Sequence, residues 1–290
     1  MDVNVATIIK VVMSGLSYSG TLAMLSVGLT LIMGVLRVMN FAHGALLMVA
    51  MYATYWFFTL FNIDPFLGLL ITIPLLFGLG VGMQKFLISP LKTHENQVLV
   101  TFMFAVLLES LALLFWSSDY RVVETSYSGI NIHFLGTGIS LLRLAMIVVA
   151  MAIVGGLHIF VKQTKMGKSI WALAQDPEAA TLVGINIHRL QWFTFGLGTA
   201  IIAIAGAFLS QLLATFPHVG FHFVIIAFVV VVLGGFGSIG GALLASFIIG
   251  FITVFSAVFI GIGYSELVVF SLFIVILVLR PAGLFGKVSL

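Results

Sequence analysis

The sequence has no cysteine and very few charged residues. The absence of cysteine among 290 residues excludes disulfides, thiolate metal sites and cysteine nucleophiles. Charged residues make up 7% of the chain, whereas soluble globular proteins carry about 25%. Because so few charges cannot cover a water-exposed surface, the composition excludes an ordinary soluble domain.

Motifs for catalysis and nucleotide binding are also missing. No GxxxxGK[ST] sequence occurs, so the chain has no phosphate cradle of that type for ATP. His94-Glu95 does not continue as HExxH, and the seven histidines show no metal-ligand spacing. Ser238 is not part of a G-x-S-x-G turn, because Phe236 stands two residues before it where the pattern needs glycine. We therefore expect no catalytic residue, no metal site and no cofactor in this chain.

Apolar residues dominate what is present, at 62% of the chain and a mean hydropathy of +1.28. A bilayer core needs about 20 consecutive apolar residues in a helix, and several uncharged blocks reach that length. The block at residues 223–233 is too short to span alone and suggests half of a broken helix. The sequence predicts an all-α, polytopic transmembrane bundle over residues 1–290, with eight or nine membrane elements, some of them broken.

The positive residues cluster in alternating connections. Residues 85–97, 162–191 and 280–290 hold eight of the 12 Lys and Arg, namely Lys85, Lys92, Lys162, Lys165, Lys168, Arg189, Arg280 and Lys287. The positive-inside rule places these connections in the cytoplasm. Because the charges adjoin apolar blocks, we expect a lipid bilayer and no nucleic acid as partner. The side of the N-terminus stays open, as does whether residues 223–233 span or re-enter.

The longest cytoplasmic connection carries the signals of a short helix. Asp176 suits the N-cap, Pro177 the first helical position and Glu178 the positive end of the helix dipole. Ala179 and Ala180 continue the turn, and Gly184 can end it. A partner could approach closely at the small Ala179 and Ala180. The alternative is an interfacial helix that packs on its own bundle.

Polar groups also occur at membrane depth, where they are costly and normally face protein or a water-filled path. Asn40, Phe41, His43 and Gly44 follow the first apolar block, and they either interrupt a helix along a substrate route or form a tight polar loop near Arg37. Glu109 faces the bundle interior or a path, or else it lies near the outer interface bonded to Ser110 or a neighbouring helix.

A glycine-rich break separates the short block from the next span. It contains Gly234, Gly235, Gly237 and Ser238, and so many glycines exclude a stable helix interior. Small residues then recur every four positions, which favours tight helix packing; they are Ser238, Ala242, Ser246 and Gly250. The break is either a hinge and packing seam or a break that lines the pathway.

Four segments resemble one transporter family. Glu178-Ala179-Ala180, three residues and Gly184 resemble the EAA loop of ABC importer permeases. The usual Ile-x-Leu-Pro continuation is absent, and Thr194 to Gly196 stand there instead. This departure is typical of the branched-chain amino acid subfamily, to which four longer segments are similar: GKSIWALAQDPEAATLVGINIHRL (167–190), NFAHG (40–44), LGGFGSIGGALLASFIIG (233–250) and RPAGLFGK (280–287).

The resemblance implies a single multi-pass permease domain in the bacterial inner (cytoplasmic) membrane. Its partners would be two cytoplasmic ABC ATPase subunits, a periplasmic binding protein and a second, homologous permease subunit, with ATP and Mg on the ATPase subunits. The ATPase would couple through residues 162–191, at Gly167, Asp176, Pro177, Glu178, Ala179, Ala180 and Gly184. The pathway or gate would involve Asn40, Phe41, His43, Gly44, Glu109, Gly234, Gly235, Gly237 and Ser238.

The resemblance implies Leu, Ile and Val as substrates, although similar permeases carry urea, short amides or small organic acids. A second hypothesis is a stand-alone secondary transporter driven by protons or sodium. Glu109 would then be the group that carries the ion. The two hypotheses differ in whether transport needs an ATPase and a binding protein.

Overall fold

The computed structural model describes residues 5–36, 38–134 and 137–285, and these residues are mostly helical. Arg37 and Lys287 therefore lie outside the described residues. The helical elements are α1 (Val5–Leu36), α2 (Ala42–Phe61), α3 (Leu69–Gly82), the π-helical η1 (Met83–Ile88), α4 (His94–Trp116), α5 (Leu141–Gln163), α6 (Lys165–Gln175), α7 (Pro177–Leu182), α8 (Ile187–Leu212), α9 (Val219–Gly234), α10 (Ile239–Phe259), the 3-10 turn η2 (Ile262–Tyr264) and α11 (Ser265–Leu279).

Within the residues that the structure describes, eight helical segments are long and apolar enough to cross a membrane, and α9 is a shorter apolar helix of 16 residues. This confirms the predicted polytopic bundle with eight or nine membrane elements. The sequence did not predict the hairpin of strands β1 (Asn131–Phe134) and β2 (Thr137–Ser140), in which Asn131 pairs with Ser140. The hairpin lies in the long connection between α4 and α5.

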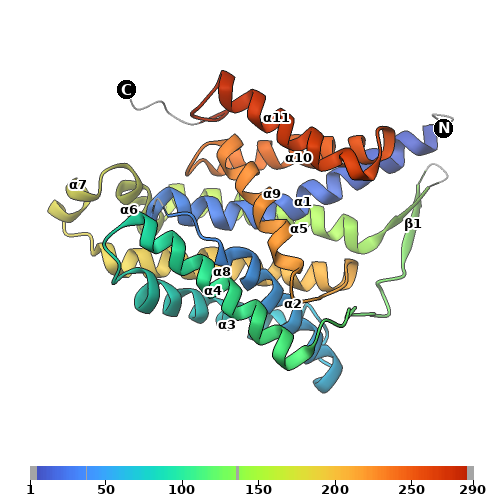
Figure 1. Cartoon of the computed structure of the whole chain (residues 1–290), viewed down its shortest axis with the longest axis horizontal. Coiled ribbons are helices and arrows are strands. Elements are labelled where there is room, and N and C mark those ends of the chain that lie inside the picture. Colours follow the sequence, from blue (N-terminus) through green and yellow to red (C-terminus); the bar gives the residue numbers. More distant parts are fainter. Residues whose placement is uncertain (1–4, 37, 135–136, 286–290) are drawn as a thin grey trace.

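The helices α1 and α8 form the centre of the bundle. Most of their side chains are buried, whereas α4, α5 and α11 bury few of theirs. In Figure 1 the α11 helix lies along one side of the bundle and α3 and α4 lie along the other. Helices that are apolar all round and exposed on their outer face are suited to contact with lipid.

Close helix packing depends on small residues at a few positions. A Cβ added to Gly250 of α10 would overlap Ser19 of α1, and one added to Gly28 of α1 would overlap the Gly198 carbonyl oxygen of α8. Ala242 and Ser246 of α10 are also buried. The predicted small-residue face of α10 is therefore a packing face, and it lies against α1.

The two ends of the bundle carry different connections. α6 and α7 lie at one end and β1 lies at the opposite end (Figure 1). The positive-inside rule assigns the α6–α7 end to the cytoplasm. Near the other end, Arg143 of α5 lies 3.5 Å from Ser14 of α1, and Lys10 lines a small cavity with Asn131. The first turns of α1 therefore lie at the end opposite α6 and α7, which the positive-inside rule places outside the cytoplasm.

Two interruptions occur where the sequence predicted them. α1 ends at Leu36 and α2 begins at Ala42, while α9 ends at Gly234 and α10 begins at Ile239. α9 does not start at the outer end of the bundle, because its Gly220 abuts Gly44 of α2, and His43 beside it contacts the middle of α1 at Leu25. α9 thus runs from within the bundle to the cytoplasmic end.

Candidate functional site

The predicted coupling segment folds as a capped helix. The Asp176 carboxylate accepts hydrogen bonds from the backbone N–H groups of Glu178 (2.9 Å) and Ala179 (3.0 Å). Pro177 occupies the first position of α7, where its missing N–H costs nothing. Gly184 follows the helix with φ of +84°, a conformation that glycine adopts without a Cβ penalty. The predicted N-cap, first position and C-terminal glycine are all confirmed.

Only one of the two alanines that the sequence suggested as a contact surface is exposed. Ala179 is exposed, but Ala180 is 3% exposed and belongs to the hydrophobic core. The large apolar side chains at the end of α7 are the exposed ones, with Leu182 at 88% and Val183 at 75%. The tip of α7, formed by Leu182 and Val183, is therefore apolar and exposed at the cytoplasmic end of the bundle. Ala180 packs into the hydrophobic core and fixes the helix there.

The preceding helix connects this tip to the bundle. Thr164 caps α6 by accepting a hydrogen bond from the Gly167 N–H at 2.9 Å. Gly167 lies so close to the backbone of Phe160 and Val161 that a Cβ would overlap both. α6 also packs against α1, α5 and α8. A force applied at α7 would therefore reach the central helices through a short, tightly packed path.

The NFAHG segment forms a buried turn. Asn40 Oδ1 accepts a hydrogen bond from the Ala42 N–H at 3.1 Å, and the Phe41 N–H donates to Thr101 Oγ1 at 3.2 Å. His43 Nε2 lies 2.9 Å from the Leu25 carbonyl oxygen, which requires the tautomer protonated at Nε2. Asn40 and His43 are fully buried, so this turn lies in the protein interior and is held by its own polar side chains.

Phe41 and Glu109 meet in one cavity. It has a volume of about 270 Å³ and lies between the start of α2, the middle of α4 and the start of α9. Glu109 Oε2 lies 3.1 Å from Nδ1 of His218, which directly precedes α9. The carboxylate of Glu109 is thus bonded to the residue that precedes α9 and also lines a cavity, and its role in a pathway stays a prediction.

The glycine-rich break lies at a different cavity, near the cytoplasmic end. That cavity has a volume of about 720 Å³, and its walls include Gly237, Ser238, Gly34 and Trp171. Gly235 and Gly237 adopt φ of +95° and +75°. Ser238 Oγ caps α10 by accepting from the Gly241 N–H at 3.1 Å, and Gly234 abuts Gly241. The predicted pathway residues therefore fall into two groups rather than one.

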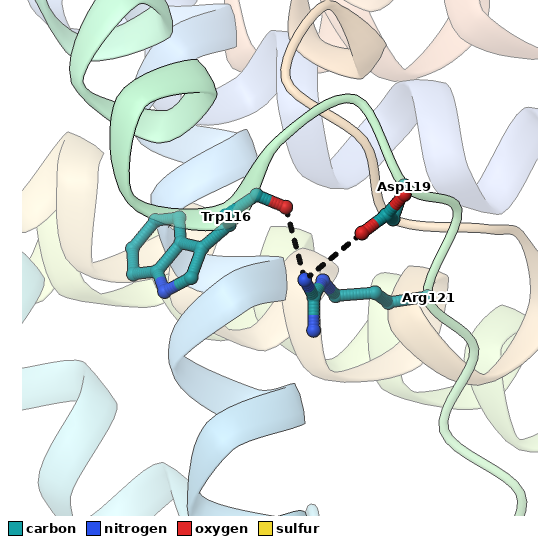
Figure 2. Close-up of polar contacts among 3 residues, drawn as sticks. All are labelled: Trp116, Asp119 and Arg121. Atoms are coloured by element: carbon teal, nitrogen blue, oxygen red, sulfur yellow. Dashed lines mark hydrogen bonds and ion pairs between the residues drawn. The ribbon is translucent and has the colours of Figure 1, made fainter.

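Arg121 contacts residues of α2 and α4 near their outer ends (Figure 2). We call these residues the Arg121 cluster. Arg121 Nη2 donates to the Trp116 carbonyl oxygen at 2.9 Å and lies 3.6 Å from Asp119 Oδ2. The guanidinium also lies over the rings of Tyr55 and Trp56, at 5.5 and 5.2 Å. Sequence reasoning missed this cluster, because an Asp and an Arg in a polar loop carry no signal of their own.

The backbone of the same residue fixes the segment that leads into α9. The Arg121 N–H donates to the Thr215 carbonyl at 3.0 Å, and the Thr215 N–H donates back at 2.7 Å. Residues 213–218 are therefore tied to the outer ends of α2 and α4. His218, the last residue of this connection, lines the cavity.

Comparison with known proteins identifies the family. A family model described as "Branched-chain amino acid transport system / permease component" matches residues 11–277. The chain belongs to this family. Among curated relatives, the permease is 28% identical to the high-affinity branched-chain amino acid transport system permease protein BraD of Pseudomonas aeruginosa, over 94% of each chain. It is 25% identical to LivH of Escherichia coli K12, again over 94% of each chain.

One solved structure shows the same fold. A chain of PsaBC from Streptococcus pneumoniae in complex with Fab superimposes with a TM-score of 0.55 and 14% sequence identity, over 95% of the permease and 94% of that chain. Family membership confirms the resemblance inferred from the four sequence segments, and it establishes a multi-pass membrane permease of the ABC transport type. The roles assigned to individual residues remain predictions.

Proposed function

We propose that this chain is the permease subunit of an ATP-driven importer of branched-chain amino acids in a bacterial inner membrane. It would act with two cytoplasmic ATPase subunits, a periplasmic binding protein and a second, homologous permease subunit. The proposal is supported by family membership and by relatives whose names state branched-chain amino acid transport. The chain itself contains no GxxxxGK[ST] sequence, so ATP and Mg would bind the partner subunits.

The exposed tip of α7 is the structural feature that supports coupling to an ATPase subunit. Apolar surface in water is unfavourable by about 25 cal/mol per Å², yet Leu182 and Val183 stand largely exposed on a capped helix beside the cytoplasmic connections. A partner subunit that covers them would gain this free energy. Movement of the partner would then pass through α6 into the central helices α1 and α8, against which α6 packs.

Acidic substitutions test the docking. Leu182→Glu and Val183→Glu should abolish copurification of the ATPase subunits, because a carboxylate replaces the buried apolar contact, while the amount of permease in the membrane stays unchanged. The matched control is Met166→Glu, an exposed apolar residue of α6, which should retain the ATPase. Wild-type copurification in both α7 variants would contradict the docking role.

Uptake measurements separate the importer from an ion-coupled carrier. Vesicles that contain the purified permease should accumulate leucine only when the second permease subunit, the ATPase subunits, ATP and the binding protein are supplied. Accumulation by the permease alone, driven by a proton or sodium gradient, would overturn the proposal and favour Glu109 as an ion carrier. Competition of leucine uptake by isoleucine and valine, compared with urea, short amides and small organic acids, would identify the substrate class.

A further inference from the structure

The cavity between α2, α4 and α9 lies part-way between the two ends of the bundle. Glu109 lies seven residues before Trp116, the last residue of α4, which places it about 10 Å below the outer end of that helix. Thr215, which pairs with Arg121 near the outer end, lies three residues before His218 of the cavity wall. The buried turn at Asn40 lies on its cytoplasmic side, because Phe41 bonds to Thr101, one turn before Ala105 of the cavity wall.

The walls of the cavity are apolar and largely aromatic. They include the rings of Phe41, Phe102 and Phe221, together with Val106. Phe41 and Phe102 pack edge to face with ring centroids 6.1 Å apart. The volume of about 270 Å³ is just below the range of about 300–1,000 Å³ typical of drug-sized ligands. The space therefore suits a small apolar group.

A carboxylate and an imidazole stand at the edge of these apolar walls. The Glu109 side chain is 17% exposed and that of His218 is 62% exposed. The contact with His218 engages Oε2 of Glu109, and a carboxylate can accept further hydrogen bonds through both oxygens. A carboxylate held in an apolar cavity at membrane depth favours a cationic partner over an anionic one.

A second pair of the same kind provides a comparison within the molecule. His222 Nδ1 lies 3.4 Å from Glu266 Oε1, and both side chains are more than half exposed. Neither residue lines the cavity that contains Glu109. The pair therefore has the same two groups outside that cavity, as expected for a surface contact of little energetic weight.

We infer that the cavity is a transient binding site for a zwitterionic amino acid with an apolar side chain. The ammonium group binds Glu109, the side chain packs among Phe41, Phe102 and Phe221, and His218 stands beside the substrate carboxylate. This inference deepens the proposed function and rests on it. The carboxylate of Glu109 disfavours small organic acids, and the apolar walls disfavour urea, so the site selects among the substrates that the family resemblance left open.

Cysteine labelling tests occupancy directly, because the chain has no cysteine. A Val106→Cys variant places a thiol on the cavity wall, and Leu114→Cys places one on the same helix outside the cavity; Val106 is 46% exposed and Leu114 is 75% exposed. In the assembled complex with binding protein, leucine should slow the modification of the Val106→Cys variant several-fold, while 4-methylpentanoate, which lacks the amine, should not. The rate for Leu114→Cys should not change with leucine.

Charge selectivity gives a readout that does not depend on transport. A cationic thiol reagent should modify the Val106→Cys variant faster than an anionic reagent of similar size. Adding Glu109→Gln should bring the two rates together, and adding Glu266→Gln should leave the preference unchanged. Equal rates for both reagents in the presence of Glu109 would contradict the assigned role of the carboxylate.

Leucine uptake separates a failure of the inference from a failure of the proposed function. Glu109→Gln keeps the side-chain shape and should reduce uptake at low leucine concentration about tenfold, equivalent to about 1.4 kcal/mol, while Glu266→Gln stays near wild type. If the wild-type complex carries no branched-chain amino acid, the proposed function is wrong. If it carries leucine but Glu109→Gln matches Glu266→Gln and leucine gives no protection of Val106→Cys, only the inference is wrong.

Discussion

Tyr127 donates a hydrogen bond to the carboxylate of Asp64 across 2.7 Å and thereby joins the connection after α2 to the long connection after α4. The Tyr127 ring also stacks on Phe66, with centroids 5.8 Å apart. Burial raises the pKa of Tyr127 above its ordinary value, and the hydrogen bond to Asp64 raises it further. Both effects favour the neutral phenol, which is the form that can donate.

This contact predicts a specific loss of stability in alkali. An unfolded tyrosine has a pKa of about 10, so below that pH both states keep the phenolic proton and the contact contributes fully. As pH rises above about 10, the unfolded chain releases this proton while the folded chain retains it, and stability falls. The thermal midpoint of the purified permease should therefore drop more steeply above that pH than below it.

Substitution isolates the contribution of Tyr127. Tyr127→Phe should lower the midpoint at neutral pH by roughly 2–4 °C, the effect of losing about 1 kcal/mol in a chain of this size, and it should flatten part of the alkaline decline. Tyr120→Phe is the control, since Tyr120 is largely exposed. An unchanged alkaline slope in Tyr127→Phe would show that Asp64 does not hold the phenol.

The second prediction concerns Arg121 at the outer end. Arg121→Lys keeps the charge but loses the planar group that bonds Trp116 and covers two rings. Amide hydrogen exchange should accelerate in residues 117–125 and 213–218. Arg143→Lys, at an exposed arginine of the same end, should leave those segments as slow as in the wild type. Wild-type exchange rates in Arg121→Lys would mean that the backbone pairing with Thr215 suffices.

The third prediction concerns the approach of α2 to α9. A Cβ on Gly44 would overlap the Gly220 carbonyl oxygen, and a Cβ on Gly220 would overlap that of Gly44. Overpacking of this kind typically costs about 1–3 kcal/mol. Here the overlapping atoms on both helices belong to the backbone. Gly44→Ala and Gly220→Ala should each lower the yield of monodisperse protein in size-exclusion chromatography.

The control for this pair is Gly240→Ala. Gly240 lies in the first turn of α10 with no atom near its missing Cβ. Alanine favours a helix over glycine by about 1 kcal/mol, so this variant should be as stable as the wild type or slightly more stable. Normal yields for Gly44→Ala and Gly220→Ala would show that the two helices can separate without loss of the fold.

The fourth prediction concerns the residue that ends the coupling segment. Left-handed backbone costs a residue with a Cβ roughly 1–2 kcal/mol, and Gly184 has φ of +84° with free space around it. Gly184→Ala should therefore loosen α7, seen as faster hydrogen exchange in residues 177–184 and weaker stimulation of the ATPase. Gly184→Asn should lie nearer to wild type, because asparagine tolerates this conformation. Equal effects of Ala and Asn would point to contact with a partner instead of backbone strain.

Features that depend on local sequence were predicted residue by residue. The N-cap at Asp176, Pro177 at the first position and Gly184 after the last turn are all found, because capping involves residues within one or two turns of each other. The interruptions after Leu36 and Gly234 were predicted for the same reason. The β1–β2 hairpin was missed, because each strand has four residues, the shortest length at which alternation indicates a strand.

The sequence by itself determined that this chain crosses a membrane many times, because length, apolar composition and charge asymmetry act without reference to distant residues. The tertiary structure alone decided that Glu109 contacts His218 and that Arg121 donates a hydrogen bond to the Trp116 carbonyl oxygen. It also decided that Ala180 is buried while Leu182 is exposed. The first of these pairs joins residues more than 100 positions apart. Such partners are set by how helices pack, and a packing arrangement depends on the shapes of all the helices together.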